Sequence, residues 1–307
     1  MLSYIHAYHA GNHADILKHI TISLIMEALC KKEKPFTVFD THSASGLYDL
    51  ADSRLEKTGE AETGIFKLKE KIEMVVSTGS TDAGTGSADA NTVSNDAEKW
   101  NPAKNYFSIV SEYLQHNQYP GSPLIENHFL REGDVQILSE LHPAVFEELV
   151  QNTKKCRIQP QLHKRNGYEM LSALTPPQIK RGLAVIDPSF EDAEDFEKCG
   201  KIISQVHKKW PVGIIALWYP LVSHRTMEIS QMKEMIASSV TSDEPKILDV
   251  QLLVKKPEEM TGLASLYGSG MYILNFPYQL DTQLESILPE LSKILSQTNS
   301  EWTVERI

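Results

Sequence analysis

From residue 134 onward, the sequence alternates between short apolar runs and segments whose apolar residues have helical spacing. Continuous apolar runs of this length are typical of strands buried on both faces. The alternation predicts an α/β domain built on a mostly parallel sheet. The strands that we expect are 35–40, 134–140, 156–161, 182–188, 212–220, 246–254 and 270–277. The helices that we expect are 12–31, 143–153, 167–174, 196–209 and 225–239.

The last two expected strands follow each other with only a loop between them, which predicts an antiparallel pair at one edge of the sheet. Earlier in the chain, residues 50–118 have helical character, as in "NYFSIVSEYLQH". Within this region, residues 77–97 are almost entirely Ser, Thr, Gly, Ala, Asn and Asp, which is too little apolar surface to pack. We therefore expect one domain over 1–307, with a helical insertion at 50–118 that contains a flexible loop at 77–97.

The overall charge limits the class of partner. The formal net charge is −11, which argues against a protein that coats nucleic acid non-specifically. One segment, 154–184, is a local exception, because it holds a single acidic residue and seven basic ones: Lys154, Lys155, Arg157, Lys164, Arg165, Lys180 and Arg181. It is either a solvated charge run or a surface that contacts phosphates.

The cysteines and the apolar runs limit the compartment. The three cysteines are far apart and form no CxxC motif, so we expect neither a disulfide framework nor a zinc-cysteine site. No apolar run approaches the ~20 residues of a membrane span, and the N-terminus lacks the regions of a signal peptide. These features favour a cytoplasmic protein with no membrane partner.

The first expected strand runs into a turn of small residues, "THSASG", which we expect to lead into a helix. Such a turn lets a ligand approach the backbone near Gly46, although a plain tight turn is an equal alternative. A nucleotide-type ligand also requires an acid at the end of the next strand, and Glu140 ends that strand. The spacing between the two fits only if 50–118 is an insertion.

Four histidines crowd the N-terminal segment: His6, His9, His13 and His19. The spacings among the first three would suit a metal site if the segment were one helix. A Gly-Asn pair interrupts it, and no carboxylate or cysteine is suitably placed to complete the ligand set. We therefore expect no metal, and histidines that bond a ligand or buried backbone.

The run "LAVIDPSFED" ends an apolar strand on Asp187, Pro188 and Phe190. These residues suit methyl transfer to the exocyclic amine of adenine, whose lone pair is delocalised into the ring. A carboxylate and a rigid proline carbonyl can accept the amine hydrogens and orient the nitrogen. An aromatic ring two positions later can stack on the base. The alternative is a strand that simply ends at a proline turn.

Several motifs resemble the RlmJ family: "SYIHAYHAGNHADILKH", "DTHSASGLY", "YPGSPLI", "SELHP", "RGLAVIDPSFE" and "ALWYP". They occur in the family's order and span nearly the whole chain. Members of this family are bacterial 23S ribosomal RNA adenine-N6 methyltransferases that use S-adenosylmethionine and no metal. The resemblance implies a Rossmann-like class I methyltransferase fold, with a seven-stranded, mostly parallel sheet, an antiparallel edge strand and a small helical insertion.

The resemblance also implies roles for individual residues. Asp187 matches the catalytic acid, and Tyr4 matches a tyrosine that helps to place the substrate base. Glu140 matches the acid that binds the ribose hydroxyls. The residues implied at the cofactor are Lys18, His19, His42, Ser122, Glu140, Asn166 and Gly167.

Three positions depart from the family pattern. Ala44 stands where the family has a glycine in the first turn. Asn166 replaces an aspartate, although its side-chain oxygen could still accept a hydrogen bond from the adenine amine. The family's DPPY is DPSF here, so Ser189 makes the loop less rigid and Phe190 lacks a hydroxyl.

We therefore expect a methyltransferase that modifies N6 of one adenine in 23S ribosomal RNA, in a protein-free or early-assembly form. The sequence does not give the oligomeric state, and we favour a monomer. Segment 154–184 would contact phosphates. DNA adenine-N6 methylation is an alternative, because the motif reads the base and not the sugar. A second alternative is a catalytically impaired nucleic-acid-binding protein linked to the use of DNA as a nutrient. An α/β enzyme with another small substrate is the third.

Overall fold

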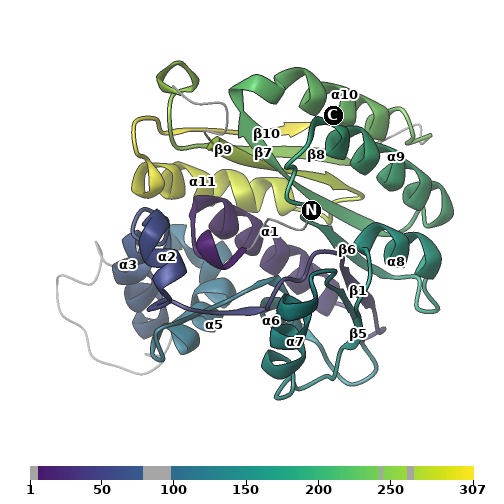
Figure 1. The fold of residues 1–307 in the computed structure, drawn as a ribbon, viewed down its shortest axis with the longest axis horizontal. Helices are drawn as coiled ribbons and strands as arrows, with labels where there is room; N and C mark the ends of the chain where they lie inside the picture. The colour runs from purple at the N-terminus through teal and green to yellow at the C-terminus, as the bar shows by residue number, and fades with distance from the viewer. Residues whose placement is uncertain (1–5, 79–97, 242–244, 261–265) are drawn as a thin grey trace.

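The computed structural model describes residues 6–78, 98–241, 245–260 and 266–307. An eight-stranded sheet runs through the molecule (Figure 1). Its strands, in spatial order, are β10 (Glu301–Arg306), β8 (Ile247–Leu253), β9 (Leu266–Leu274), β7 (Ile214–Val222), β6 (Gly182–Ile186), β1 (Thr37–Asp40), β4 (Val135–Ser139) and β5 (Gln161–His163). The five strands from β7 to β5 are parallel, and the other three alternate in direction.

The five parallel strands have the order of a Rossmann-type sheet. The order in which strands are added to the sheet reverses at β1, with β4 and β5 on one side of it and β6 and β7 on the other. The α/β class and the Rossmann-like core are confirmed. The expected antiparallel pair of the last two strands is confirmed as β8 and β9. The edge itself differs from the prediction, because β9 lies between β7 and β8 and an eighth strand, β10, forms the edge. Strand β10 was missed because half of its residues are charged, which is typical of a protected edge strand.

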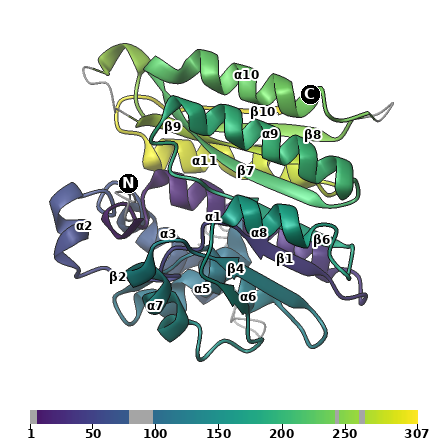
Figure 2. The same ribbon diagram turned by 45° about the vertical axis from the view of Figure 1, so that its right-hand side comes forward.

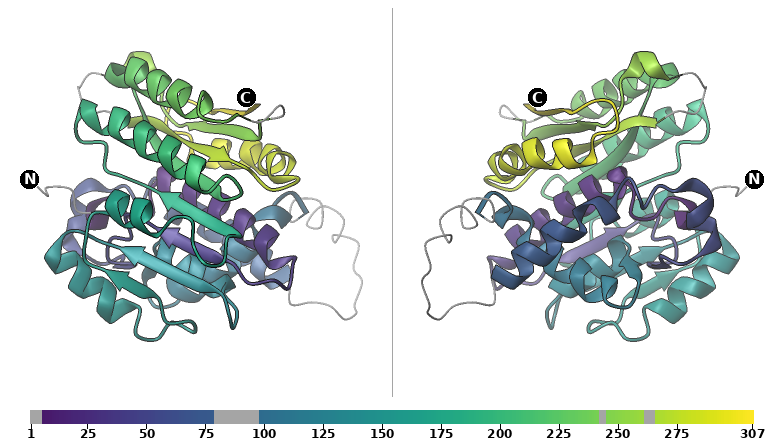
Figure 3. Two further views of the ribbon diagram at one scale, coloured as in Figure 1. Left: turned by 90° about the vertical axis from the view of Figure 1, so that its right-hand side faces the viewer. Right: turned by 90° about the vertical axis from the view of Figure 1, so that its left-hand side faces the viewer.

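Helices cover both faces of the sheet (Figures 2 and 3). The helices on one face are α1 (His13–Cys30), α6 (Ser122–Phe129) and α11 (Leu280–Leu295). Those on the other face are α8 (Gly167–Leu174), α9 (Ala193–Lys209) and α10 (Thr226–Ala237). In Figure 3, the green α9 and α10 face the viewer in the left panel, and the yellow α11 in the right panel.

Successive side chains of each strand point to opposite faces of the sheet, so the sheet has one hydrophobic core on each face. In β6, Leu183 and Val185 pack into the core beneath α1, and Ala184 and Ile186 pack into the core beneath α9. The strand therefore has no solvent-exposed face, as its continuous apolar run predicts. Among the described helices, none combines the length and apolar character that a bilayer span requires.

The region between β1 and β4 holds further short elements. They are β2 (Leu47–Asp49), α2 (Ser53–Thr58), α3 (Ile65–Thr78), η2 (Asn101–Ala103), α5 (Lys104–Leu114) and β3 (Gln118–Pro120). Strands β2 and β3 form a separate antiparallel pair, and the apolar faces of α3 and α5 join the core around α1 and α11. Of the expected loop at 77–97, residues 77 and 78 end α3, and 79–97 lie outside the described residues.

The remaining described elements are short or peripheral. They are η1 (His6–Tyr8), α7 (Pro143–Asn152), η3 (Ser223–Arg225) and η4 (Pro257–Glu259). The expected helix after the first turn is wrong, because the chain enters β2 and pairs with β3 instead. This pairing joins residues about 70 positions apart, so local spacing could not reveal it.

Candidate active site

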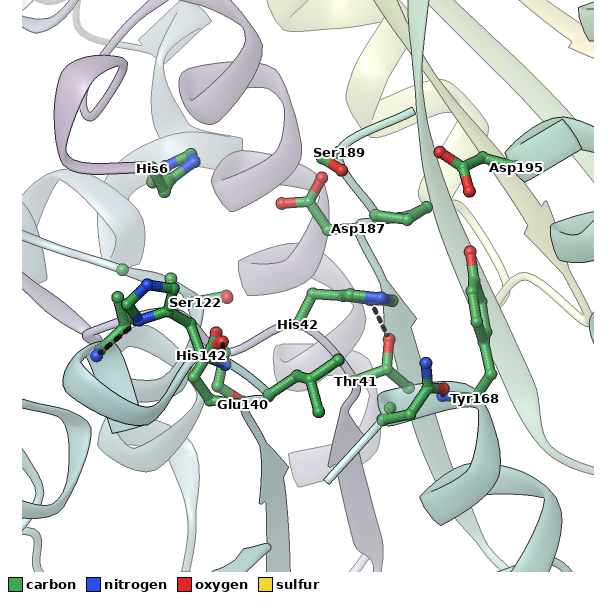
Figure 4. A pocket seen from close by; sticks show the side chains of 18 of the residues that line it. His6, Thr41, His42, Ser122, Glu140, His142, Tyr168, Asp187, Ser189 and Asp195 are labelled. Atoms are coloured by element: carbon green, nitrogen blue, oxygen red, sulfur yellow. Dashed lines mark hydrogen bonds between the residues drawn. The ribbon is translucent and has the colours of Figure 1, made fainter. Parts of the chain in front are cut away.

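The carboxyl ends of β1, β4, β5 and β6 meet at one edge of the sheet and border a cavity of about 380 Å³. Nine of the predicted site residues line it: Lys18, His19, His42, Ser122, Glu140, Asn166, Gly167, Asp187 and Pro188. In the view of Figure 4, His6, Asp187 and Ser189 lie in the upper part and Glu140 and Tyr168 in the lower part. This is the edge where open α/β sheets bind ligands.

Three predicted site residues are not placed on the cavity wall. Tyr4 lies outside the described residues. Gly46 does not line the cavity; it has φ +73° and its carbonyl accepts a hydrogen bond from the Gly121 N–H at 2.8 Å. Its backbone conformation therefore shapes the turn behind the cavity, where a side chain would be strained. The third residue, Phe190, is described below.

Asp187 ends β6 and is held by a lysine from the other end of the chain. The Lys18 ammonium lies between two carboxylates: it donates a short hydrogen bond to Asp187 Oδ2 and lies 2.9 Å from Asp15 Oδ1. Burial alone would lower the pKa of Lys18, but the charges of Asp15 and Asp187 raise it well above its usual range. The lysine is therefore charged, and it fixes one oxygen of the Asp187 carboxylate.

A second buried carboxyl lies beneath the cavity, at the end of β1. Asp40 Oδ2 accepts a hydrogen bond of 2.6 Å from the Ser122 hydroxyl. Burial raises the pKa of Asp40 to about 6, against the lowering effect of Ser122. Because Ser122 uses its hydrogen for this bond, its oxygen can only accept from a ligand in the cavity.

Glu140 supplies a carboxyl group to the cavity wall, and His42 supplies an imidazole ring. The Glu140 carboxylate accepts a hydrogen bond of 2.7 Å from the His142 N–H, and burial raises its pKa above the usual range. Burial lowers the pKa of His42 to about 4, so the imidazole is neutral at pH 7. Its Nδ1 bonds the Thr41 hydroxyl at 2.8 Å, and its ring meets Tyr168 edge-on at 5.2 Å.

Asn166 and Gly167 begin α8 beside the first turn. A Cβ on Gly167 would lie 1.9 Å from the Thr41 carbonyl oxygen, so only glycine lets the helix approach this closely. The Asn166 Oδ1 accepts from the N–H groups of Tyr168 and Glu169, at 3.0 and 3.2 Å. Both lone pairs are thus used for the helix cap. The acceptor that we expected for an adenine amine is occupied, and Asn166 offers its amide N–H donors instead.

His19 presents a polar atom that needs a partner. Its Nδ1 is 2.8 Å from the Tyr119 hydroxyl, whereas its buried Nε2 has no hydrogen-bond partner among the described residues. Burial lowers the pKa of His19 to about 3, so the ring is neutral. A ligand in the cavity that His19 lines could satisfy this atom.

Phe190 does not lie where a base-stacking residue would. Its ring stacks on Phe196, with centroids 4.4 Å apart, and lies 6.2 Å from Trp218. The side chain is buried in the core beneath α9 and does not line the cavity. Its φ of +49° is unusual for a bulky residue, so the packing holds a strained backbone just after Asp187.

The seven basic residues of segment 154–184 do not share one surface. Lys164 and Arg165 follow β5 and lie at the carboxyl edge, next to the cavity residue Asn166. Lys180 and Arg181 precede β6 and lie at the amino edge, where Arg181 donates to the carbonyls of Leu29 and Lys34. Between these two pairs the chain returns from the carboxyl edge to the amino edge through α8, which charge counting along the sequence overlooks.

Two further residues organise the site, His6 and Asp15. The sequence singled out His6 only as one of four N-terminal histidines, and it gave Asp15 no role in the site. His6 lines the cavity, and its ring is tilted by 56° against that of Tyr48, with centroids 5.3 Å apart. The only available signal was Asp15 three residues before Lys18 on one helix. Within the described ranges, no group of His, Cys, Asp or Glu is arranged to hold a metal ion.

Comparisons with known proteins identify the family. Residues 33–78 and 97–307 match the family described as "Ribosomal RNA large subunit methyltransferase D, RlmJ". The chain belongs to the RlmJ family. A Haemophilus influenzae protein named ribosomal RNA large subunit methyltransferase J is 35% identical over 315 residues, which cover 100% of this chain and 99% of that protein. The Escherichia coli protein of the same name is 34% identical, with the same coverage.

One solved structure shares the fold over nearly the whole chain. A crystal structure of a Legionella pneumophila protein has a TM-score of 0.79 with this chain at 27% identity, and the match covers 97% of this chain and 98% of the other. The RlmJ assignment confirms the resemblance carried by the motifs. It also identifies the chain as an S-adenosylmethionine-dependent methyltransferase by family.

Proposed function

We propose that this RlmJ-family chain transfers a methyl group from S-adenosylmethionine to N6 of one adenine in 23S ribosomal RNA. The observation that carries the proposal is the Asp187–Pro188 pair, which lines the same cavity as Glu140, Asn166 and Gly167. The named relatives are ribosomal RNA large subunit methyltransferases and match over the full chain. A shared activity follows from that length of similarity.

The cavity residues suit this cofactor. Glu140 would accept from the ribose hydroxyls, and the neutral His42 and Asn166 would border the adenosine. His19 lines the cavity as well, and its buried Nε2 has no hydrogen-bond partner among the described residues. When bound, S-adenosylmethionine supplies an electrophilic methyl group on a positively charged sulfur.

Asp187 and Pro188 would act on the adenine amine. Their oxygens accept the two N6 hydrogens and hold the nitrogen so that its lone pair points at the methyl carbon. The N6 lone pair would form the new N–C bond as the S–C bond breaks, the electrons of the broken bond would leave with the neutral thioether, and the proton lost from the nitrogen would pass to water. The negative charge of Asp187 stabilises the positive charge that develops on the amine.

The basic residues at the carboxyl edge would contact the RNA backbone. Lys164 and Arg165 flank the cavity on exposed positions, where their partners Glu147 and Glu169 are 3.7 and 3.9 Å away. Exposed pairs of this length contribute little, so both cations can exchange carboxylates for phosphates. We propose these two, rather than the whole of segment 154–184, as the phosphate contacts.

The test is transfer of tritium from labelled S-adenosylmethionine to 23S RNA stripped of protein. We expect incorporation at one position, recovered as N6-methyladenosine after nuclease digestion. Asp187→Asn keeps the side-chain shape and should lose at least about a hundredfold in kcat while still binding the cofactor. The same assay is run with intact large ribosomal subunits and with adenine-containing DNA, for comparison with the protein-free RNA.

The outcomes separate the alternatives. Incorporation into DNA but not RNA would replace the proposal with DNA methylation. Cofactor binding without incorporation into either nucleic acid would reject adenine as the substrate. Failure to bind the cofactor at all would favour the alternative of a nucleic-acid-binding protein that catalyses no reaction.

A further inference from the structure

Asp15 is a buried carboxylate at which several hydrogen bonds converge. It lies in the first turn of α1, with 1% of its side chain exposed. Its Oδ2 accepts from the Gly11 N–H at 2.9 Å and lies 3.0 Å from His6 Nε2. Its Oδ1 lies 2.9 Å from the Lys18 ammonium. Each oxygen thus holds a different part of the N-terminal region.

The contacts of Asp15 extend to two pairs of residues that line the cavity. Through Lys18 it reaches Asp187 at the end of β6, and through His6 it reaches the ring of Tyr48. His6, Lys18, Tyr48 and Asp187 all line the cavity, whereas Asp15 does not. Asp15 can therefore affect the reaction only through the residues that it holds.

Lys18 needs a second carboxylate partner besides Asp187. A lysine side chain has four rotatable bonds, and a single carboxylate fixes its ammonium poorly. Asp15, one helical turn before Lys18, supplies a second anchor on the same rigid element. Burial would raise the pKa of Asp15, but the charges of His6 and Lys18 hold it well below its usual range. The anchor is therefore ionised throughout the neutral range.

We propose that Asp15 is a positioning residue for methyl transfer, which orients the Asp187 carboxylate through Lys18 and docks the His6 turn on the same side of the cavity. This role rests on the function proposed above. An acceptor oxygen must match the direction of an N–H bond, and a displacement of about 1 Å can cost about a hundredfold in rate. Asp15 thus links the start of the chain to the reacting group.

The test compares Asp15→Asn with a control from the same protein. Asp249 and Lys233 form another buried ion pair, with 2.6 Å between Nζ and Oδ2, and neither lines the cavity. Asp249→Asn therefore reproduces the loss of a buried carboxylate charge away from the site. Asp15→Asn leaves Lys18 paired with Asp187, so neither variant leaves an ammonium without a carboxylate or a hydroxyl partner.

We expect Asp15→Asn to lower kcat for 23S RNA by about ten- to a hundredfold, with KM for RNA and affinity for S-adenosylmethionine changed less than about threefold. Asp249→Asn should lower the melting temperature at least as much as Asp15→Asn does, and it should leave kcat within about twofold of the wild-type value. If Asp15→Asn retains full kcat, or if both variants lose kcat equally, the role of Asp15 is structural and the inference falls.

A double variant locates the route of the effect. If Asp15 acts through Lys18, adding Asp15→Asn to Lys18→Met should cause little further loss of kcat. Full multiplication of the two losses would show an independent action and overturn the route. Wild-type protein is assayed in parallel, so absence of methylation there signals failure of the proposed function, and the inference falls with it.

Discussion

At the scale of single residues, Ala44 adopts a backbone conformation that suits glycine. Its φ is +47°, in the left-handed region, and it lines the cavity. A Cβ in that region crowds the neighbouring carbonyl, which costs about 1–2 kcal/mol. The sequence predicted a consequence for this position because the family has glycine there, and the dihedral angle supplies the physical reason.

Ala44→Gly should therefore raise the free energy of unfolding by about 0.5–1 kcal/mol, after allowance for the greater freedom of glycine in the unfolded chain. The measurement is urea denaturation without cofactor. Ala28→Gly, inside α1, is the matched control and should lose up to about 1 kcal/mol. A loss at both positions would show that Ala44 carries no strain.

Asp40 predicts a pH dependence of stability. Its pKa of about 6 in the folded protein exceeds the value of about 4 in an unfolded chain. Its contribution to stability is complete below pH 4 and is lost as the pH rises through 6. Between pH 4 and 7, Asp40→Asn should gain up to about 3 kcal/mol relative to the wild type. A difference that is constant with pH would contradict this.

The role of a site residue was predictable from the sequence where neighbouring residues of one motif act together. Asp187 and Pro188 are adjacent in sequence, so their joint use as acceptors needed no structure. Asn166 shows the limit, because the use of its oxygen depends on where α8 begins. The contact of Lys18 with Asp187 joins positions 169 residues apart, and no local pattern encodes it.

At the scale of elements, apolar runs predicted four of the five strands of the parallel core, β1, β4, β6 and β7, and the expected helix 167–174 matches α8. The weak strand expected at 156–161 is displaced, since β5 covers Gln161–His163. No element was expected after residue 277. Helix α11 has a regular apolar spacing there, but Pro289 inside it counts against a helix. Strand β10 has no apolar run, because its stability comes from pairing with β8.

At the scale of the whole molecule, an acidic protein must bind a polyanion. The net charge of −11 repels RNA at a distance, so the cations beside the cavity must provide local attraction. Lys164 and Arg165 lie at that edge, and Lys180 lies at the other. The position within the fold, and not the number of charges, decides which of them can touch the substrate.

Replacement of Lys164 and Arg165 by Gln should weaken RNA binding and reduce the slope of log affinity against log salt by about one to two. Titration of RNA at several salt concentrations measures this slope. Lys180→Gln removes a charge at the amino edge and should leave the slope unchanged. Equal changes in the two proteins would mean that only net charge matters.

The burial of α1 has a consequence for synthesis on the ribosome. Fifteen of its residues are buried, and the surfaces that cover it include β9 and α11, which are among the last elements to emerge. At about 5–20 residues per second, this apolar helix stays uncovered for many seconds after it leaves the exit tunnel. A chain that is cut short before α11 therefore cannot complete the core that supports Lys18.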